Sequence, residues 1–218
     1  MLKKIFKSFF GPIRIGVNGN KTLLFLWLKK DLSKIYDEIG VDLAGGSMLN
    51  RKFFKTKKYI CVDINQDKLN EGLLLNKDAT AVNSKIENFM SNVNQKKPNL
   101  IVCVQTMGVN TNFNHEKTLE VIKMMFKFLE NDGCLIFNLG NKVNLKIIEE
   151  DLKIFFKNKF QTIEIRPYGA FKVTSKKPYH FSLRFLIAFL MDIFPPLRTF
   201  FGLKKNNLYY FCKNKKIT

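Results

Sequence analysis

The chain has few of the residues that usually hold metals or form cross-links. It contains four cysteines and two histidines in 218 residues. The cysteines lie inside apolar runs, without the paired spacing of a zinc site or a disulfide framework, at Cys61, Cys103, Cys134 and Cys212. We therefore expect four buried thiols in a reducing, cytoplasmic compartment, with no disulfide and no metal site.

Long hydrophobic runs are also missing. The most apolar segment, Phe181–Phe194, has 14 residues, which is too short to span a bilayer as a helix. Residues 1–10 are basic and rich in phenylalanine, but Gly11 and Pro12 interrupt them before a signal peptide could form. Two alternatives stay open for the apolar segment. It is either a buried helix or a lid or interfacial helix that contacts lipid or an apolar substrate.

Acidic residues are scarce at both ends of the chain. The net charge is +19, yet residues 35–151 hold 15 basic and 15 acidic side chains. The excess lies in residues 1–34, with eight basic and one acidic, and in residues 152–218, with 14 and two. Such flanks suit an anionic partner, either a membrane surface or a nucleic acid. A solvated basic surface without a specific partner is the alternative.

Apolar runs of strand length alternate with segments of helical periodicity. This alternation predicts an α/β fold with right-handed crossovers, namely a Rossmann-like, doubly wound, seven-stranded sheet that is mostly parallel and has an antiparallel C-terminal hairpin. The expected strands are 39–44, 59–62, 79–82, 99–105, 134–139, 162–166 and 208–213. The expected helices are 22–36, 49–54, 67–75, 85–93, 115–129 and 145–156.

The same pattern suggests how the chain is divided. Residues 1–37 form a basic N-terminal segment with a helix, and residues 38–218 form one domain. Within that domain, 167–207 is a long insertion between the two late strands, and we interpret it as a candidate lid.

Two strand ends carry the most specific signal. The run Val41–Met48 ends in small residues, and the run Tyr59–Ile64 contains an acid at Asp63. A buried strand that ends in small residues lets the backbone approach a ligand. An acid about 20 positions later can bind the two hydroxyl groups of a ribose. The sequence therefore predicts a nucleoside cofactor site.

Four motifs occur in a characteristic order: Asp42-Leu43-Ala44-Gly45-Gly46, Asp63-Ile64, Asp78-Ala79 and Val102-Cys103-Val104-Gln105-Thr106. Together they resemble the class I S-adenosylmethionine-dependent methyltransferases, and the resemblance covers about residues 38–140 and the late hairpin. The pattern looks most like the small bacterial enzymes of glycan and secondary-metabolite pathways. Ala44 stands where that family usually has glycine. Leu49 replaces the third small residue of the dinucleotide fingerprint, which disfavours a nicotinamide cofactor.

The resemblance implies which residues hold the methionine end of S-adenosylmethionine. Ala44, Gly45 and Gly46 would let the backbone approach it, and Asp42 would organise this turn or reach the methionine end through water. Gln105 would lie under the sulfonium, where the acceptor arrives. As alternatives, Asp42 and Gln105 only cap their strands.

The nucleoside end is assigned by the same resemblance. Asp63 would accept hydrogen bonds from both ribose hydroxyls, and Ile64 would lie against the adenine. Asp78 would accept a hydrogen bond from the adenine amino group, with the Ala79 backbone as a nearby donor. The alternatives are a strand cap for Asp63 and a turn-forming residue for Asp78.

Methyl transfer needs mainly proximity and orientation, and an alcohol acceptor gains further from a general base. Of the two histidines, His115 opens a helix, whereas His180 lies with Tyr179 in the insertion. We expect His180 and Tyr179 to face the substrate as catalytic residues. No Asn-Pro-Pro-Tyr-type motif follows Gln105, which argues against amino methylation of DNA bases or protein glutamine.

The expected activity is therefore O-methylation of a small-molecule, saccharide (glycan) or lipid-linked acceptor by a cytoplasmic enzyme. Attachment to an anionic membrane surface is an open addition, and nucleic acid is not excluded as a partner. A different class of function is a non-catalytic Rossmann-like module that binds membrane or RNA through its basic flanks. The sequence does not define the oligomeric state.

Overall fold

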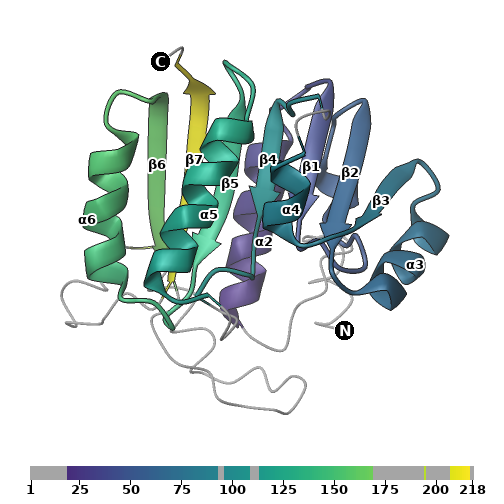
Figure 1. Cartoon of the computed structure of the whole chain (residues 1–218), viewed down its shortest axis with the longest axis horizontal. Helices are drawn as coiled ribbons and strands as arrows, with labels where there is room; N and C mark the ends of the chain where they lie inside the picture. Colours follow the sequence, from purple (N-terminus) through teal and green to yellow (C-terminus); the bar gives the residue numbers. More distant parts are fainter. Residues whose placement is uncertain (1–18, 93–95, 109–112, 169–193, 195–206, 217–218) are drawn as a thin grey trace.

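A single mixed sheet organises the molecule (Figure 1). The computed structural model describes residues 19–92, 96–108, 113–168, 194 and 207–216. The seven strands have the order β3-β2-β1-β4-β5-β7-β6. The neighbours from β3 to β5 pair in parallel, whereas β7 is antiparallel to both β5 and β6. The predicted fold class is confirmed. The bounds are Ile39–Leu43, Lys58–Asp63, Ala79–Asn83, Leu100–Cys103, Cys134–Leu139, Phe160–Tyr168 and Asn207–Lys215, for β1 to β7.

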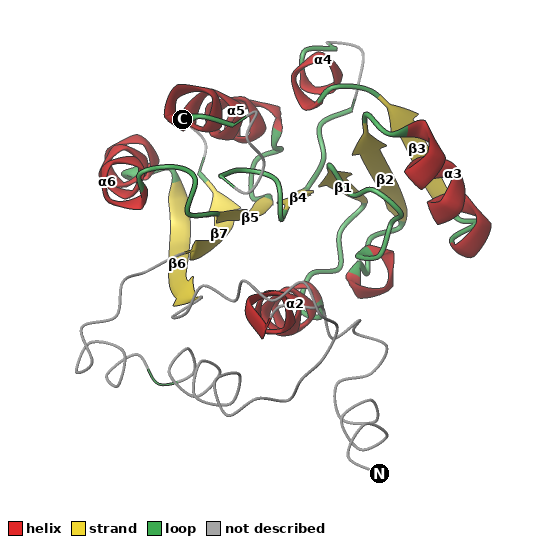
Figure 2. Cartoon of the chain, turned by 90° about the horizontal axis from the view of Figure 1, so that it is seen from below, coloured by secondary structure: helices red, strands yellow, loops and turns green. Residues whose placement is uncertain are grey.

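Helices cover both faces of the sheet. Figure 2 shows α2 on one face and α4, α5 and α6 on the other. Three helices begin with an asparagine whose side chain accepts a hydrogen bond from a backbone N–H three residues later, which satisfies one free donor of the first turn. The bounds are Gly19–Leu32, Gln66–Leu75, Ile86–Met90, His115–Phe128 and Leu145–Phe156 for α2 to α6, with the 3-10 helix η1 at Arg51–Phe53.

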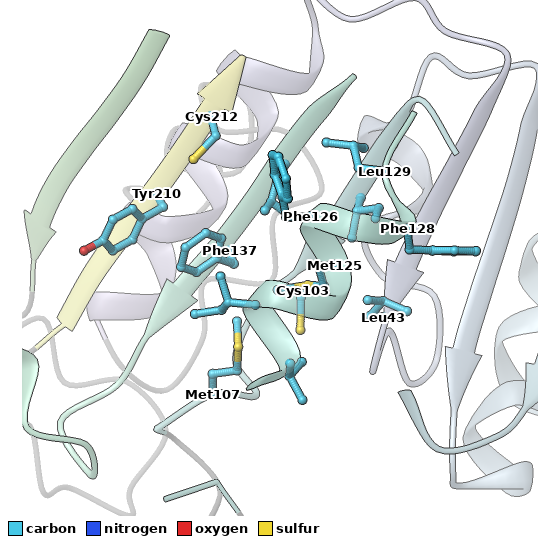
Figure 3. Close-up of a cluster of buried hydrophobic side chains, with 14 of the residues drawn as sticks. Leu43, Cys103, Met107, Met125, Phe126, Phe128, Leu129, Phe137, Tyr210 and Cys212 are labelled. Carbon is cyan, nitrogen blue, oxygen red and sulfur yellow. The ribbon is translucent and has the colours of Figure 1, made fainter. Parts of the chain in front are cut away.

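The core lies on both sides of the central strands. All residues of β1, β4 and β5 are buried, as expected for parallel strands covered by helices on both faces. Figure 3 shows the cluster on the face of α5, with Leu43, Cys103 and Met125 close together. In the same cluster, the rings of Phe137 and Tyr210 stack with centroids 4.6 Å apart.

The four cysteines lie in the interior of the protein. All four cysteines are buried and free, and burial raises the pKa of the Cys103 thiol to about 12. The predicted buried thiols are therefore confirmed.

Among the helices that the structure describes, none is both long and apolar enough to cross a membrane.

Helix α2 is held on the sheet by a buried polar cluster as well as by apolar contacts. Leu24, Leu28 and Leu32 recur at helical spacing and are buried. Asp31 in the last turn receives two hydrogen bonds from the Arg166 guanidinium of β6, at 2.7 and 3.1 Å. The hydroxyl of Tyr209 on β7 donates a third, at 2.8 Å. Helix α2 therefore packs into the same core as the sheet.

The structure shortens one predicted helix and describes only the two ends of the candidate lid. The helix predicted over 22–36 ends at Leu32, where the Ser33 hydroxyl donates to the Lys30 carbonyl and competes with the helical pattern. The candidate lid at 167–207 begins within β6 and ends within β7. Most of it, including nearly all of the apolar segment 181–194, lies outside the described residues.

Candidate functional site

The turn after β1 has a strained backbone. Ala44, Gly46 and Met48 adopt positive φ angles of 55°, 54° and 57°. For residues other than glycine this conformation costs about 1–2 kcal/mol. Backbone hydrogen bonds hold the turn in place, from Gly45 N–H to the Val62 carbonyl and from Met48 N–H to the Gly45 carbonyl. Strain that neighbouring structure maintains is found preferentially at ligand sites.

Asp42 supports this turn from below. Its carboxylate is fully buried and accepts hydrogen bonds from the Tyr59 hydroxyl at 2.9 Å and from the Asn50 amide, the nearer contact being 3.1 Å. A Cβ atom at Gly45 would lie 2.7 Å from the Asp42 Oδ2 atom, so the turn rests directly on the carboxylate. This geometry fits the predicted role of organising the turn. Asn50 and Tyr59 were not among the predicted site residues.

Burial of Asp42 predicts a dependence of stability on pH. Desolvation raises the pKa of Asp42 to about 7, while the hydrogen bonds from Tyr59 and Asn50 act in the opposite direction. The unfolded chain has the ordinary value of about 3.9. Between these values the folded state binds the proton and the unfolded state does not. The contribution of Asp42 to unfolding free energy therefore falls as pH rises from about 4 to 7, by up to roughly 1.4 kcal/mol per pH unit.

Urea unfolding at pH 5 and pH 7.5 checks this expectation. Asp42→Asn is the matched variant, since it keeps the shape and cannot titrate. The unfolding free energy of the parent, relative to that of the variant, should be lower at pH 7.5 than at pH 5. Parallel pH profiles of the two proteins would contradict the assignment.

Asp63 at the end of β2 joins the turn to the next loop. Its Oδ2 atom accepts a hydrogen bond from Gly46 N–H and its Oδ1 atom accepts one from Asn65 N–H, both at 2.9 Å. A carboxylate oxygen has two lone pairs, so each retains one for a ligand hydroxyl. A Cβ atom at Gly46 would be in ordinary van der Waals contact with the Lys68 Cδ atom at 3.6 Å and the Asp63 Oδ2 atom at 3.9 Å, so no atom crowds the backbone there. The exposed Ile64 side chain follows, at 70% of its full accessibility.

The structure does not bring Asp78 and Ala79 to these residues. Ala79 is the first residue of β3 and pairs with Tyr59 at the start of β2, whereas Asp63 pairs with Asn83. Because the strands are parallel, Asp78 lies at the opposite edge of the sheet, where it forms an exposed ion pair with Arg51. This placement corrects the predicted location of both residues, and we remove them from the candidate site.

Asn83 and Ser84 occupy the place that Asp78 was expected to fill. The Asn83 amide and the Ser84 N–H both donate to the Asp63 carbonyl, at 3.3 and 3.1 Å. Both residues therefore lie beside the end of β2. The only signal in the sequence was that two polar residues follow the short, weakly apolar strand.

Gln105 lies just past the end of β4, the strand next to β1. It adopts a positive φ of 62°, and its N–H donates to the Asn138 side chain at 2.6 Å. Asn138 is a buried polar residue of β5. The loop continues close to the turn after β5, because Gly140 N–H donates to the Met107 carbonyl. The carboxyl ends of β1, β2 and β4 thus meet at one edge, as predicted for Asp42, Asp63 and Gln105.

The two residues predicted to be catalytic, Tyr179 and His180, lie outside the described residues. The other histidine, His115, is at the start of α5, and its Nε2 atom lies 2.9 Å from the Asp151 carboxylate of α6. His115 therefore joins two helices, in keeping with the expectation that it is not the acceptor-facing histidine. In the part of the chain that the structure describes, no group of three potential metal ligands occurs.

Known proteins share this architecture at the level of structure but not of sequence. No protein-family model and no curated protein sequence matches the chain. Solved structures are similar in fold. The plantazolicin methyltransferase BpumL, crystallised with a triazolic desmethylPZN analog and SAH, has 15% sequence identity and a TM-score of 0.57, with 98% of this chain and 91% of that chain covered.

Two further similar structures are methyltransferases with other names. The N-methyltransferase NodS from Bradyrhizobium japonicum WM9, in complex with S-adenosyl-l-homocysteine, has 11% identity and a TM-score of 0.59, covering 94% of this chain and 91% of that chain. An rRNA methylase from Streptococcus thermophilus has 14% identity and a TM-score of 0.50, covering 90% and 97%. The chain thus has the fold of the class I S-adenosylmethionine-dependent methyltransferases.

Proposed function

We propose that the protein is an S-adenosylmethionine-dependent methyltransferase whose acceptor is a small molecule, a saccharide or a lipid-linked intermediate, methylated on oxygen. The observation that carries the proposal is the Asp63 carboxylate. It is fixed by two backbone N–H groups, keeps a lone pair on each oxygen and lies beside Gly46, where a Cβ atom would meet no atom closer than 3.6 Å. That arrangement suits a cis diol such as the ribose of the cofactor.

The surrounding residues fit the rest of the cofactor. The turn at Ala44 and Gly46, with its positive φ angles, would bring backbone groups close to the methionine end. Ile64 offers an apolar surface to the adenine, and Asn83 and Ser84 provide polar groups near its edge. Gln105 occupies the end of β4, next to β1. The fit rests on the geometry of these residues together with the fold shared with SAH-bound methyltransferases.

The chain's own contribution to the reaction is mainly orientation. When bound, S-adenosylmethionine supplies an electrophilic methyl group on its sulfonium. Asp63 would fix the nucleoside, and the Asp42-supported turn would fix the methionine end. An acceptor could then approach past Gln105 in line with the methyl group. Holding the two reactants in this geometry reduces the entropic cost of the reaction. His180 or Tyr179 is our candidate for removing the proton of an alcohol acceptor.

Replacing Asp63 tests the site directly. Asp63→Ala should weaken binding of S-adenosylhomocysteine by about 1.5–3 kcal/mol, the range for hydrogen bonds to a charged group. Isothermal titration calorimetry measures this change. The matched control is Asp78→Ala, which removes a carboxylate from the other edge of the sheet and should leave affinity unchanged. If Asp78→Ala weakened binding and Asp63→Ala did not, the corrected site would be wrong.

The acceptor atom needs a separate experiment, because NodS is an N-methyltransferase whereas we propose oxygen. The protein would be incubated with methyl-labelled S-adenosylmethionine and with paired acceptors that differ only in a hydroxyl or an amino group. Mass spectrometry should find the label on the hydroxyl members. Labelling of the amines alone would overturn O-methylation. Failure of the protein to bind S-adenosylhomocysteine would instead favour the non-catalytic module.

A further inference from the structure

The amino edge of the sheet, opposite to the cofactor edge, is one continuous strip. In Figure 1 this edge is at the top, where β7 ends. Backbone hydrogen bonds join neighbouring segments of this edge, for example Lys57 to Asp37, Glu130 to Pro98 and Lys216 to Lys159. We call this strip the basic rail. It consists of 33–38, 54–58, 91–92 with 96–99, 129–133, 157–159 and 213–216.

Most of the excess positive charge of the described residues lies on the basic rail. The rail holds 11 lysines and four acidic residues, whereas all other described residues together hold 15 basic and 13 acidic side chains. Eight of the rail lysines are exposed and two are half-buried. Lys215 alone is buried, with its ammonium group donating to the Leu129 carbonyl. A uniform preference for lysine would not produce this asymmetry.

Helix dipoles explain only a small part of it. Helices in this fold end at the amino edge, and lysines near helix C-termini are stabilised by the dipole. That effect falls off within the last turn. Lys34 and Lys157 lie next to the ends of α2 and α6, but Lys97 follows the end of α4 by seven residues and Lys213 belongs to a strand. The helix dipole therefore explains only a minority of the lysines on the basic rail.

We propose that the basic rail binds the phosphate backbone of single-stranded RNA. The rail crosses six strands, which is about 24 Å at the usual strand spacing, and so offers charge along a line. Tyr36, at 76% of its full accessibility, is the one large exposed hydrophobic side chain within the described rail. One such side chain suits stacking on a base but gives a bilayer little apolar surface to bury. The inference does not depend on the proposed methyl transfer, which belongs to the other edge.

Fluorescence anisotropy with a labelled 12-nucleotide oligouridylate tests the proposal. The logarithm of the binding constant is measured against the logarithm of salt concentration from 50 to 200 mM, which counts the phosphates neutralised. The triple variant Lys55→Gln, Lys97→Gln, Lys216→Gln removes three exposed lysines from the rail. Its slope should become shallower by about 2, and its affinity at 50 mM salt should fall at least tenfold.

The control triple is Lys123→Gln, Lys142→Gln, Lys146→Gln, which removes the same charge from exposed positions off the rail. It should keep nearly the slope and affinity of the parent. Equal losses in both triples would show diffuse charge and overturn the proposal. So would lack of binding by the parent, tighter binding to a DNA duplex, or rail-dependent binding to anionic phosphatidylserine vesicles without RNA binding. Calorimetry with S-adenosylhomocysteine on the rail triple should be unchanged, which separates this test from that of the cofactor site.

Discussion

An Arg166→Met variant is expected to lose about 3–5 kcal/mol of unfolding free energy, because removal of one partner leaves a buried charge uncompensated. Asp31 is only 3% exposed and receives two of its three hydrogen bonds from Arg166. Without the guanidinium, only the Tyr209 hydroxyl would remain as a donor. Urea unfolding followed by circular dichroism measures the loss.

A second substitution separates this cause from lost packing. Arg166 also packs against the rings of Trp27 and Tyr209. Asp31→Leu combined with Arg166→Met removes the buried charge and should recover most of the stability. Lys57→Met, which breaks the exposed pair with Glu38, is the surface control and should cost no more than about 1 kcal/mol. A loss below about 1 kcal/mol in Arg166→Met would show that the ion pair between Arg166 and Asp31 does not stabilise the fold.

Gly45→Ala is expected to abolish detectable cofactor binding and to lower the unfolding free energy by about 1–3 kcal/mol, the usual cost of overpacking. The added Cβ would lie 2.7 Å from both the Asp42 Oδ2 atom and the Cys61 Sγ atom. Either the carboxylate or the turn must move. Calorimetry with S-adenosylhomocysteine and urea unfolding report the two effects independently.

Gly46→Ala provides the comparison one residue later. Its Cβ would meet no atom closer than 3.6 Å, so the stability cost should be the smaller cost of a left-handed alanine. Cofactor affinity should still fall, because the methyl group would lie 3.9 Å from the Asp63 Oδ2 atom, where we propose that the ribose binds. If Gly45→Ala bound the cofactor as the parent does, the turn would not be the binding element.

The strands and helices could be predicted from the sequence because each has a strong local pattern. The strands predicted over 39–44, 59–62 and 99–105 are found at Ile39–Leu43, Lys58–Asp63 and Leu100–Cys103. The helix predicted over 115–129 is found at His115–Phe128. Asp42, near the carboxyl end of β1, lies directly against Gly45 of the turn that follows. The resemblance implies that Gly45 lets the backbone approach the ligand, whereas the structure shows that a side chain at this position would point at Asp42.

The remaining errors come from information that local patterns do not contain. The resemblance assigns Asp78 to the adenine, but β3 begins just after Asp78, so the residue lies at the opposite end of the strand from Asp63. The left-handed backbone of Gln105 depends on a bond to Asn138, which is 33 positions away. The contact between Asp31 and Tyr209 spans 178 positions. Such pairings follow from strand order, which one sequence alone does not reveal.

The position of β7 has a consequence for how the protein is made. Within the described sheet, β6 pairs only with β7, and β7 fills the gap between β6 and β5. On the ribosome, β6 therefore emerges with no partner, and the outer edge of β5 stays open until residues 207–215 follow. Unpaired edges of this kind are prone to join other chains. A nascent chain released before residue 207 would thus lack two strands of its sheet rather than one, and would expose the edge of β5 to its neighbours.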